Sequence, residues 1–453
     1  MFNRIVILLF FCILSKSSYS QVSKNVKRMS WDNIEVVWLQ DERFPVYNLV
    51  FYFADGALSD KRKRYGETDL MFDMLSSGTR RFSQREISDN LEFYGSDFST
   101  HVTHEYSLFE VSGLVKDIVP TLKQICHLFR DATFPKRELV KEKRQRRNRL
   151  KNLITSHGSL ADRAFRELSM KFSPFSKPVS GKLSSLKMIK QKHLKDKLDY
   201  FNKSVKKRIY ITGPKSSLIS KEIINEECRW SGGENNFVRK QAFKSKTNRG
   251  VFLITVPKAN QTQLRIGKVL SKNEITRPEL LLFSSNFLGG GFTSLLMKAV
   301  RVEAGLSYGV GAFAAGQKEY GRSGISTFTK NKQINQLLSV VKNTLKNVHM
   351  NRFKNDDFER SKGYLIGSYP FSFEKSSDFL RQLISLDHKE IDYKYFYDLP
   401  NIIKKITREE VSKSSKNLFL WKDQTIVIVG PKSLYKRLKK IGKIKVIPYQ
   451  KFL

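Results

Sequence analysis

The spacing of apolar residues predicts the same succession of elements in both halves of the chain. β-Branched and aromatic residues first form strand-like runs, a helix follows, and a further segment of alternating strands comes next. The predicted elements lie at 33–54, 66–79 and 83–114 in the first half, and at 250–270, 277–291 and 305–330 in the second. Each half therefore mixes strand meanders with helices.

The two halves also end alike. IYITGPKSS at Ile209–Ser217 recurs as IVIVGPKSL at Ile426–Leu434, which places Gly213 opposite Gly430, and the helical segments upstream keep the same offset. Such agreement over tens of residues indicates a duplicated domain. We therefore predict an α+β fold of two homologous half-domains, each an antiparallel sheet with helices packed on one face.

The predicted helix within GETDLMFDMLSSGT (Gly66–Thr79) has two different faces. At ~100° per residue, one face carries apolar side chains and is expected in a core. The four residues of that face are Leu70, Met71, Met74 and Leu75, and those of the other are Asp69, Phe72, Asp73 and Ser76. The second face thus presents two carboxylates one helical turn apart around an aromatic ring.

The N-terminus has the pattern of a secretory signal peptide. Arg4 precedes the apolar run Ile5–Leu14, and small residues allow cleavage before Gln21. The run is too short to span a bilayer, and no later stretch reaches the ~18 apolar residues that a spanning helix needs. We expect a signal peptide at 1–20, a periplasmic or secreted mature chain, and no transmembrane segment.

The domain boundaries follow from these patterns and from a polar, charged stretch between the halves. We place the N-terminal half-domain at 21–232, a linker at 233–250, and the C-terminal half-domain at 251–453. With 40% hydrophobic residues in 453, the chain can build real cores.

The mature chain retains two cysteines, Cys126 and Cys228. An oxidising compartment permits a disulfide between them, but the apolar surroundings of Cys126 favour a small buried thiol. We leave the pairing open, with the free thiols as the favoured expectation.

The chain is strongly basic, with 82 Lys and Arg against 43 Asp and Glu and a net charge of +39. Such a charge is compatible with polyanionic partners. The excess is spread along the chain, however, and aromatic residues do not alternate with it as base-stacking platforms would. We interpret the dense run Lys141–Lys151 as a solvated helical face and expect no nucleic-acid partner.

These segments together resemble the pitrilysin or insulinase-like family of zinc metallopeptidases, in the short bacterial form that is also similar to mitochondrial processing peptidase subunits. The resemblance covers nearly the whole exported chain and implies a clamshell of two half-domains. In that family the first half carries H-x-x-E-H on a helix and a further Glu downstream. The two His bind Zn²⁺, and the Glu between them is the general base.

The resemblance implies that this zinc motif is degenerate here. The two His positions correspond to Asp69 and Asp73, and the base position corresponds to Phe72, which cannot accept a proton. The downstream ligand is expected near 146–150, where the chain reads RRNRL, and the nearest acid is Glu142. We therefore expect no catalytic residue and no bound metal in this chain.

The histidines do not supply an alternative site. His101 and His104 lie three apart on a predicted strand, so their side chains point to opposite faces.

The second half keeps its family signature better. NFLGGGFTSLLMKAVRVEAGLSYGVGAF resembles the family segment in which an Arg and a Tyr bind substrate in the active site of the other half, and the corresponding residues are Arg301 and Tyr308. Arginine is suited to a peptide carbonyl or carboxylate, and tyrosine to the oxyanion. A structural alternative makes Arg301 a helix-terminal cation and Tyr308 a strand core residue.

In bacterial members of this form, a chain with the zinc motif pairs with one that keeps only the Arg and Tyr. The resemblance thus implies an exported non-catalytic subunit of a heteromeric insulinase-like zinc peptidase, which binds extended peptide and whose partner holds the zinc. One alternative is a peptidase-derived scaffold or peptide-binding protein with no proteolytic role. A second is an active metallopeptidase with an atypical metal site.

Overall fold

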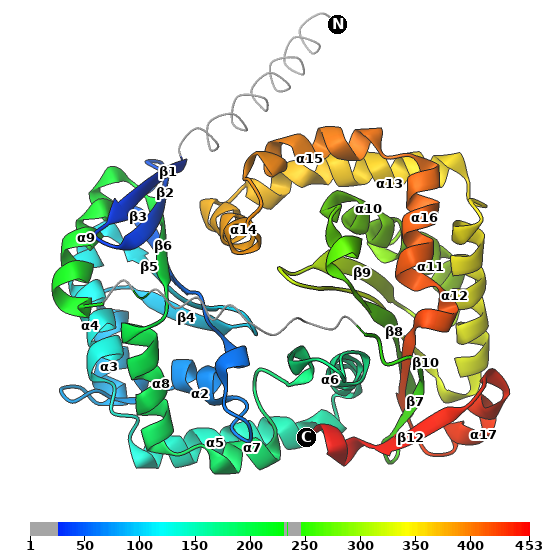
Figure 1. The fold of residues 1–453 in the computed structure, drawn as a ribbon, viewed down its shortest axis with the longest axis horizontal. Helices are drawn as coiled ribbons and strands as arrows, with labels where there is room; N and C mark the ends of the chain where they lie inside the picture. Colours follow the sequence, from blue (N-terminus) through cyan, green and yellow to red (C-terminus); the bar gives the residue numbers. More distant parts are fainter. Residues whose placement is uncertain (1–25, 231–232, 234–245) are drawn as a thin grey trace, which may run out of the picture. The chain divides into compact units, whose positions relative to one another are not determined.

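The computed structural model describes residues 26–230, 233 and 246–453, and the chain divides into two compact units (Figure 1). Unit 1 is made of Met1–Arg147, Val179–Lys240 and Pro370–Ser385, and unit 2 of Asn148–Pro178, Gln241–Tyr369 and Leu386–Leu453. The predicted signal peptide and most of the predicted linker lie outside the described residues, so these two assignments stay predictions. The proposed half-domain boundaries stay predictions as well.

A six-stranded sheet in the order β1-β2-β6-β3-β5-β4 forms the centre of unit 1. Its strands are β1 (Val26–Trp31), β2 (Ile34–Gln40), β3 (Val46–Phe53), β4 (Asp97–Val102), β5 (Ser107–Leu114) and β6 (Lys207–Gly213). The helices that lie mostly in this unit are α2 (Glu67–Asp73), α3 (Gln84–Phe93), α4 (Ile118–Asp131), α5 (Lys136–Lys151), α7 (Leu183–Met188), α8 (Gln191–Lys203), α9 (Ser220–Ile223) and α14 (Ser376–Lys389).

Unit 2 contains a second six-stranded sheet, in the order β12-β7-β11-β8-β10-β9. Its strands are β7 (Gly250–Thr255), β8 (Gln261–Leu270), β9 (Val310–Gly316), β10 (Gly321–Lys330), β11 (Thr425–Gly430) and β12 (Ile444–Pro448). Its helices are α6 (His157–Ser169), α10 (Pro278–Gly289), α11 (Leu295–Met297), α12 (Ile334–His349), α13 (Asn355–Ser368), α15 (Lys394–Lys405), α16 (Arg408–Phe419) and α17 (Leu434–Leu438).

The two sheets confirm the α+β class and the duplication. The sequence repeat aligns β6 with β11, and each of these strands lies between counterparts of the same chain order, β2 and β3 in unit 1 and β7 and β8 in unit 2. Both sheets are mixed, since β2 runs parallel to β6 and β7 runs parallel to β11. The parallel pairs arise because β6 and β11 return to the sheet after long helical connections, as parallel pairing requires.

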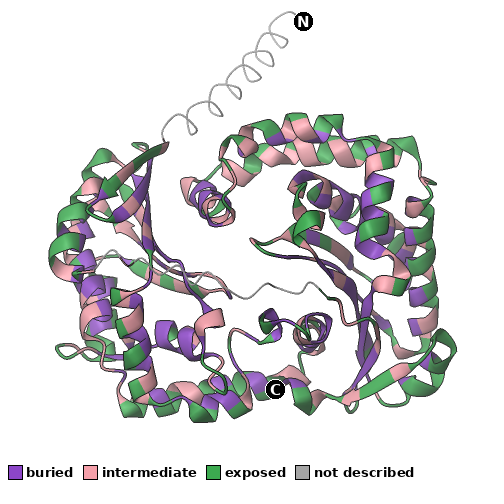
Figure 2. Ribbon diagram, in the orientation of Figure 1, coloured by how far each residue is buried: buried purple, intermediate pink, exposed green. Residues whose placement is uncertain are grey.

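The cores lie on the sheets, where buried positions concentrate along the strands (Figure 2). In unit 2, apolar side chains on one face of the sheet pack against α10, α12 and α16. The other face packs against α6, through Phe165 and its neighbours on that helix. Helices therefore cover both faces of this sheet. The prediction placed helices on one face only, and α6 covers the other. Among the described residues, no helix is both long and apolar enough to cross a membrane.

A disulfide joins Cys126 of α4 to Cys228, 102 residues further along the chain. The expectation of free thiols was therefore wrong. Both cysteines are buried, as expected, but the helical turn Ile224–Cys228 packs against α4 and brings the two sulfurs together. No local sequence pattern records this contact, because it depends on how the chain returns to α4 after β6.

We predict that the double substitution Cys126→Ala with Cys228→Ala lowers the free energy of unfolding by about 2 to 4 kcal/mol, because the unfolded chain loses a long covalent loop. Urea denaturation of the mature chain, with and without reductant, measures the effect. Reductant should lower the midpoint of the wild type and leave that of the double variant unchanged. Equal midpoints for the two proteins without reductant would contradict the bond.

Candidate functional site

The helix α2 is held at its N-terminus by a buried carboxylate. Asp60 accepts hydrogen bonds from the backbone N–H groups of Gly66 at 2.7 Å and Thr68 at 3.0 Å, and from the Thr68 hydroxyl at 2.6 Å. Gly66 has φ of 93°, and a Cβ there would lie 2.8 Å from the backbone nitrogen of Gly181. Only glycine fits this start, so the position and direction of α2 are fixed.

A second buried carboxylate, Asp55, lies directly after β3 and is 1% exposed. The backbone N–H of Gly56 donates to its Oδ1 at 2.6 Å. Burial raises the pKa of Asp55 to about 6, although Lys197 and Tyr200 oppose the shift. At neutral pH the Asp55 carboxylate is therefore charged, and this buried charge lowers the stability of the folded state.

The two carboxylates of α2 hold a single guanidinium. Arg146 of α5 donates from Nη1 to Asp69 Oδ2 at 2.6 Å and forms a very short ion pair from Nη2 to Asp73 Oδ2. Its Nη2 also donates to the Asp69 carbonyl at 3.2 Å, and its Nε donates to Glu142 at 3.1 Å. The Arg146 side chain is only 4% exposed, so this charge is enclosed by the carboxylates that neutralise it.

Arg146 thus places a protein cation between the two carboxylates. Burial disfavours the charged form of Arg146, but Asp69 and Asp73 more than offset this effect and raise its pKa. The guanidinium is thus permanently charged, and its planar fork occupies the oxygens that a metal would need. The residues at the predicted motif therefore do not fit Zn²⁺.

Phe72, at the expected base position, belongs to the core. Its side chain is 1% exposed, and its ring contacts Phe53 and Phe201 edge to face, with centroid distances of 5.6 and 5.2 Å. Helical spacing placed Phe72 beside Asp69 and Asp73 and did not predict its burial, which arises because α2 is enclosed on more than one side. α2 packs against α8 and β4, and the side chains of Asp69 and Asp73 remain partly accessible, at 22% and 41%.

The carboxylates lie beside the last strand of the unit 1 sheet. The Thr100 hydroxyl of β4 donates to Asp73 Oδ1 at 3.3 Å. In the described part of the chain, β4 pairs on one side only, with β5, so its other side presents backbone donors and acceptors. An extended peptide could pair with this edge as an added strand.

The histidines do not form a metal centre within the described residues. His101 lies on β4, whereas His104 is buried in the turn that follows it. No group of three or more His, Cys, Asp or Glu in the described ranges is arranged to hold a metal ion.

Arg301 and Tyr308 are surface residues of unit 2. Arg301 lies in the helical segment Lys298–Glu303, with its guanidinium 5.2 Å from the centre of the Phe292 ring. Tyr308 precedes β9 and is 83% exposed, so it is not a core residue, and Phe292 is 76% exposed. Both residues are therefore accessible to a ligand.

Comparisons with known proteins match the two halves of the chain separately. Residues 36–181 match the model described as Insulinase (Peptidase family M16), and residues 216–365 match that of the Peptidase M16 inactive domain. The chain belongs to the insulinase-like peptidase family M16. The resemblance drawn from the degenerate motif is thereby confirmed at the level of the family.

Relatives and solved structures of the M16 family extend over most of the chain. An "Uncharacterized zinc protease YmxG" of Bacillus subtilis is 22% identical over 391 residues, which cover 84% of this chain and 92% of that protein. A "Non-peptidase homolog YmxG" of Helicobacter pylori is 27% identical over 170 residues, 36% of this chain and 37% of that one. The crystal structure of a peptidase M16 inactive domain from Pseudomonas fluorescens has the same fold, with a TM-score of 0.80, 21% identity, and coverage of 90% and 98%.

Arg146 is the residue that sequence reasoning did not single out, although a signal was present. It is the first residue of RRNRL, where the M16 resemblance places the downstream acidic ligand. A charge reversal at that position, together with Asp at both His positions, is what a guanidinium in place of the metal requires.

We predict that Arg146→Gln lowers the free energy of unfolding by about 1 to 3 kcal/mol, because the partly buried carboxylate of Asp69 and the more exposed one of Asp73 lose their countercharge. Urea denaturation at neutral pH measures the loss. The matched control is Arg147→Gln, an exposed arginine on the same helix, which should change stability by less than about 0.5 kcal/mol. Adding Asp69→Asn and Asp73→Asn to Arg146→Gln should recover much of the loss. Equal effects of the two single substitutions would contradict the buried ion pairs.

We also predict that Asp55→Asn stabilises the protein at pH 7 to 8 by about 3 kcal/mol, the equivalent of raising the pKa from 3.8 to about 6. The folded state binds this proton more tightly than the unfolded state does. The penalty for Asp55 is therefore complete above pH 6 and disappears as the pH falls to about 4. Stability curves of both proteins from pH 4 to 8 should converge at the acidic end, and parallel curves would contradict the shift.

Proposed function

We propose that this chain is an exported, non-catalytic subunit of a heteromeric M16 zinc peptidase, in which a related partner carries the zinc. The observation that carries the proposal is the Arg146 guanidinium, which occupies Asp69 and Asp73 at the position of the family's metal ligands. Because Arg146 neutralises both carboxylates, no metal ion is needed to balance their charge. Phe72 in the aromatic core removes the general base as well.

The peptide-binding parts of the fold are nevertheless present. The strand β4 keeps one unpaired side within the described residues, and Arg301 and Tyr308 remain exposed in unit 2. In this proposal β4 pairs with extended peptide, while Arg301 and Tyr308 bind peptide held in the partner's active site. Retention of these features beside a disabled centre supports a role in substrate binding more than a loss of all function.

Export of the chain is part of the proposal. The N-terminal pattern is that of a signal peptide, and the disulfide between Cys126 and Cys228 is typical of chains that mature in an oxidising compartment. The name of the Helicobacter pylori relative, a non-peptidase homolog, agrees with an inactive chain of this family.

A peptidase-derived scaffold or peptide-binding protein with no proteolytic role is the second candidate. The enclosed Arg146 is compatible with this alternative, whereas the exposed Arg301 and Tyr308 favour the subunit role. An active metallopeptidase with an atypical metal site is less well supported, because any metal would have to displace the guanidinium from both carboxylates.

We predict that replacing Arg301 and Tyr308 lowers the peptidase activity of the native complex. Arg301→Ala and Tyr308→Phe should each reduce kcat/KM by tenfold to hundredfold, about 1.4 to 3 kcal/mol of transition-state stabilisation. The complex is isolated through a tag on the mature chain, and its hydrolysis of a quenched fluorescent peptide is measured.

Matched controls are Arg352→Ala and Tyr364→Phe, two exposed residues of the same unit that lie outside this segment. These should leave kcat/KM unchanged. Full activity of the Arg301→Ala, Tyr308→Phe double variant in an intact complex would instead favour the scaffold. Turnover by the purified chain alone would establish the atypical peptidase.

A further inference from the structure

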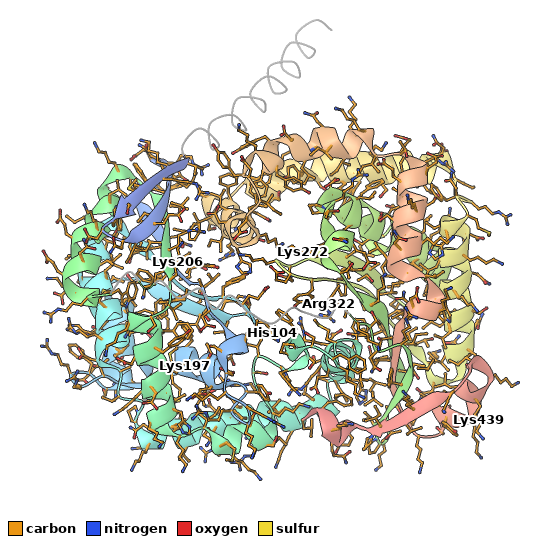
Figure 3. All side chains as sticks on the ribbon, in the orientation of Figure 1. His104, Lys197, Lys206, Lys272, Arg322 and Lys439 are labelled. Atoms are coloured by element: carbon orange, nitrogen blue, oxygen red, sulfur yellow. A yellow bond between two sulfur atoms is a disulfide. The ribbon has the colours of Figure 1, made fainter. Side chains whose placement is uncertain are left out.

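Arg322 is a cation on the sheet of unit 2 that faces α6 (Figure 3). Its guanidinium lies near two aromatic rings, 5.3 Å from the centre of Phe165 of α6 and 5.9 Å from that of Phe313 of β9. On the same strand, Ile325 points to the opposite face and packs in the core with α10 and α12. Arg322 therefore lies on the α6 side of the sheet, in mostly apolar surroundings.

No side chain of the described residues neutralises Arg322. Its Nε is buried without a hydrogen-bond partner, and no ion pair joins the guanidinium to a carboxylate in the part of the chain that the structure describes. The nearby acid is Asp162, and this carboxylate is bound by Arg265 from β8, at 2.5 Å to Nε and 3.3 Å to Nη2. Arg265 thus shows how an arginine on this face is normally paired, and Arg322 has no equivalent partner among the described residues.

A second arginine increases the imbalance. Arg166 of α6 also makes no ion pair within the described ranges, and it is near enough to repel Arg322. Burial, with this repulsion added, lowers the pKa of Arg322 to about 10, which still leaves the group charged at neutral pH. An enclosed charge without a partner costs stability, so its presence points to an anion that comes from outside these residues.

An aromatic ring of the neighbouring strand β9 lies beside Arg322 and is partly exposed. Gly324 lies two residues from Arg322 on the same face, and a Cβ there would come within 2.4 Å of the Phe313 ring. Glycine therefore allows Phe313 to lie flat on the strand beside Arg322, and this ring remains 42% exposed. Both rings lie within cation–π distance of the guanidinium, whose planar set of N–H donors is suited to a planar acceptor.

We propose that Arg322 and Arg166 form a binding site for a peptide carboxylate, with Phe313 as an apolar wall beside it. A carboxylate matches the guanidinium fork in two parallel hydrogen bonds, and the neighbouring ring contacts the aliphatic part of the same residue. This combination of charge and apolar surface fits a peptide better than a small inorganic anion. The inference rests on the proposed function, because it names the group of a bound peptide that unit 2 recognises. The carboxylate comes from an acidic side chain or from the peptide C-terminus.

The test is the affinity of the full mature chain for four fluorescent ten-residue peptides of alanine, serine and leucine. These carry either Glu or Gln at the centre, and either a free or an amidated C-terminus, and binding is followed by fluorescence anisotropy. Loss of the carboxylate that is recognised should weaken binding by about tenfold or more. A preference for Glu identifies a side chain, and a preference for the free terminus identifies the terminal carboxylate.

The same four peptides are then tested against variants of the protein. Arg322→Gln should abolish the preference, so that all four peptides bind equally weakly, and Arg166→Gln should reduce it. Arg322→Lys keeps the charge and loses the fork, so it should retain part of the preference. Arg352→Gln, which removes an exposed arginine of the same unit, should leave it unchanged. A preference that survives Arg322→Gln would overturn the site.

The melting temperature of the Arg322→Gln variant shows whether Arg322 has an ionic partner within the chain. That of Arg322→Gln should equal or exceed the wild-type value, because an unpaired charge is removed. A lower melting temperature would reveal an internal partner and overturn the proposal. Tight binding of all four peptides without preference would refute this site and leave the proposed function standing, whereas no binding of any peptide would count against both.

Discussion

The contact between α2 and α5 in unit 1 depends on the guanidinium of Arg146, which lies between Asp69 and Asp73. Two carboxylates one turn apart on a mostly buried helix would repel each other and lose solvation, and they are tolerable only with a cation between them. The resemblance to zinc peptidases implies metal ligands at these two positions. Here α5 supplies the cation from its own side chain, so the helix pair is held together by the chain itself.

This substitution separates two properties that a metal centre combines. A metal cross-links helices and also activates water, whereas arginine provides the cross-link and cannot serve as a Lewis acid. The aromatic contacts of Phe72 with Phe53 and Phe201 then consolidate the same region with apolar packing. In unit 1 the ion pairs of Arg146 and the packing of Phe72 thus stabilise the same helix, α2.

The sequence predicted the architecture well, because strand periodicity and the repeat of Gly213 at Gly430 are properties of the chain itself. It also identified Asp69, Phe72 and Asp73 as a degenerate motif. It did not predict the Phe72 environment, since helical periodicity describes one buried face and α2 has more than one. The sequence patterns also did not predict the disulfide or the contacts of Arg146, for a related reason. Both join residues that are far apart in sequence, and the local spacing of residues does not predict which distant side chains come into contact.

The measurement that tests the central claim most directly is the zinc content of the purified mature chain, by elemental mass spectrometry after equilibration against a zinc buffer. We predict a stoichiometry near zero for the wild type, because the Arg146 guanidinium is paired with both carboxylates. A stoichiometry near one that is lost in Asp69→Ala or Asp73→Ala would contradict it, since zinc would then have displaced the arginine from the site.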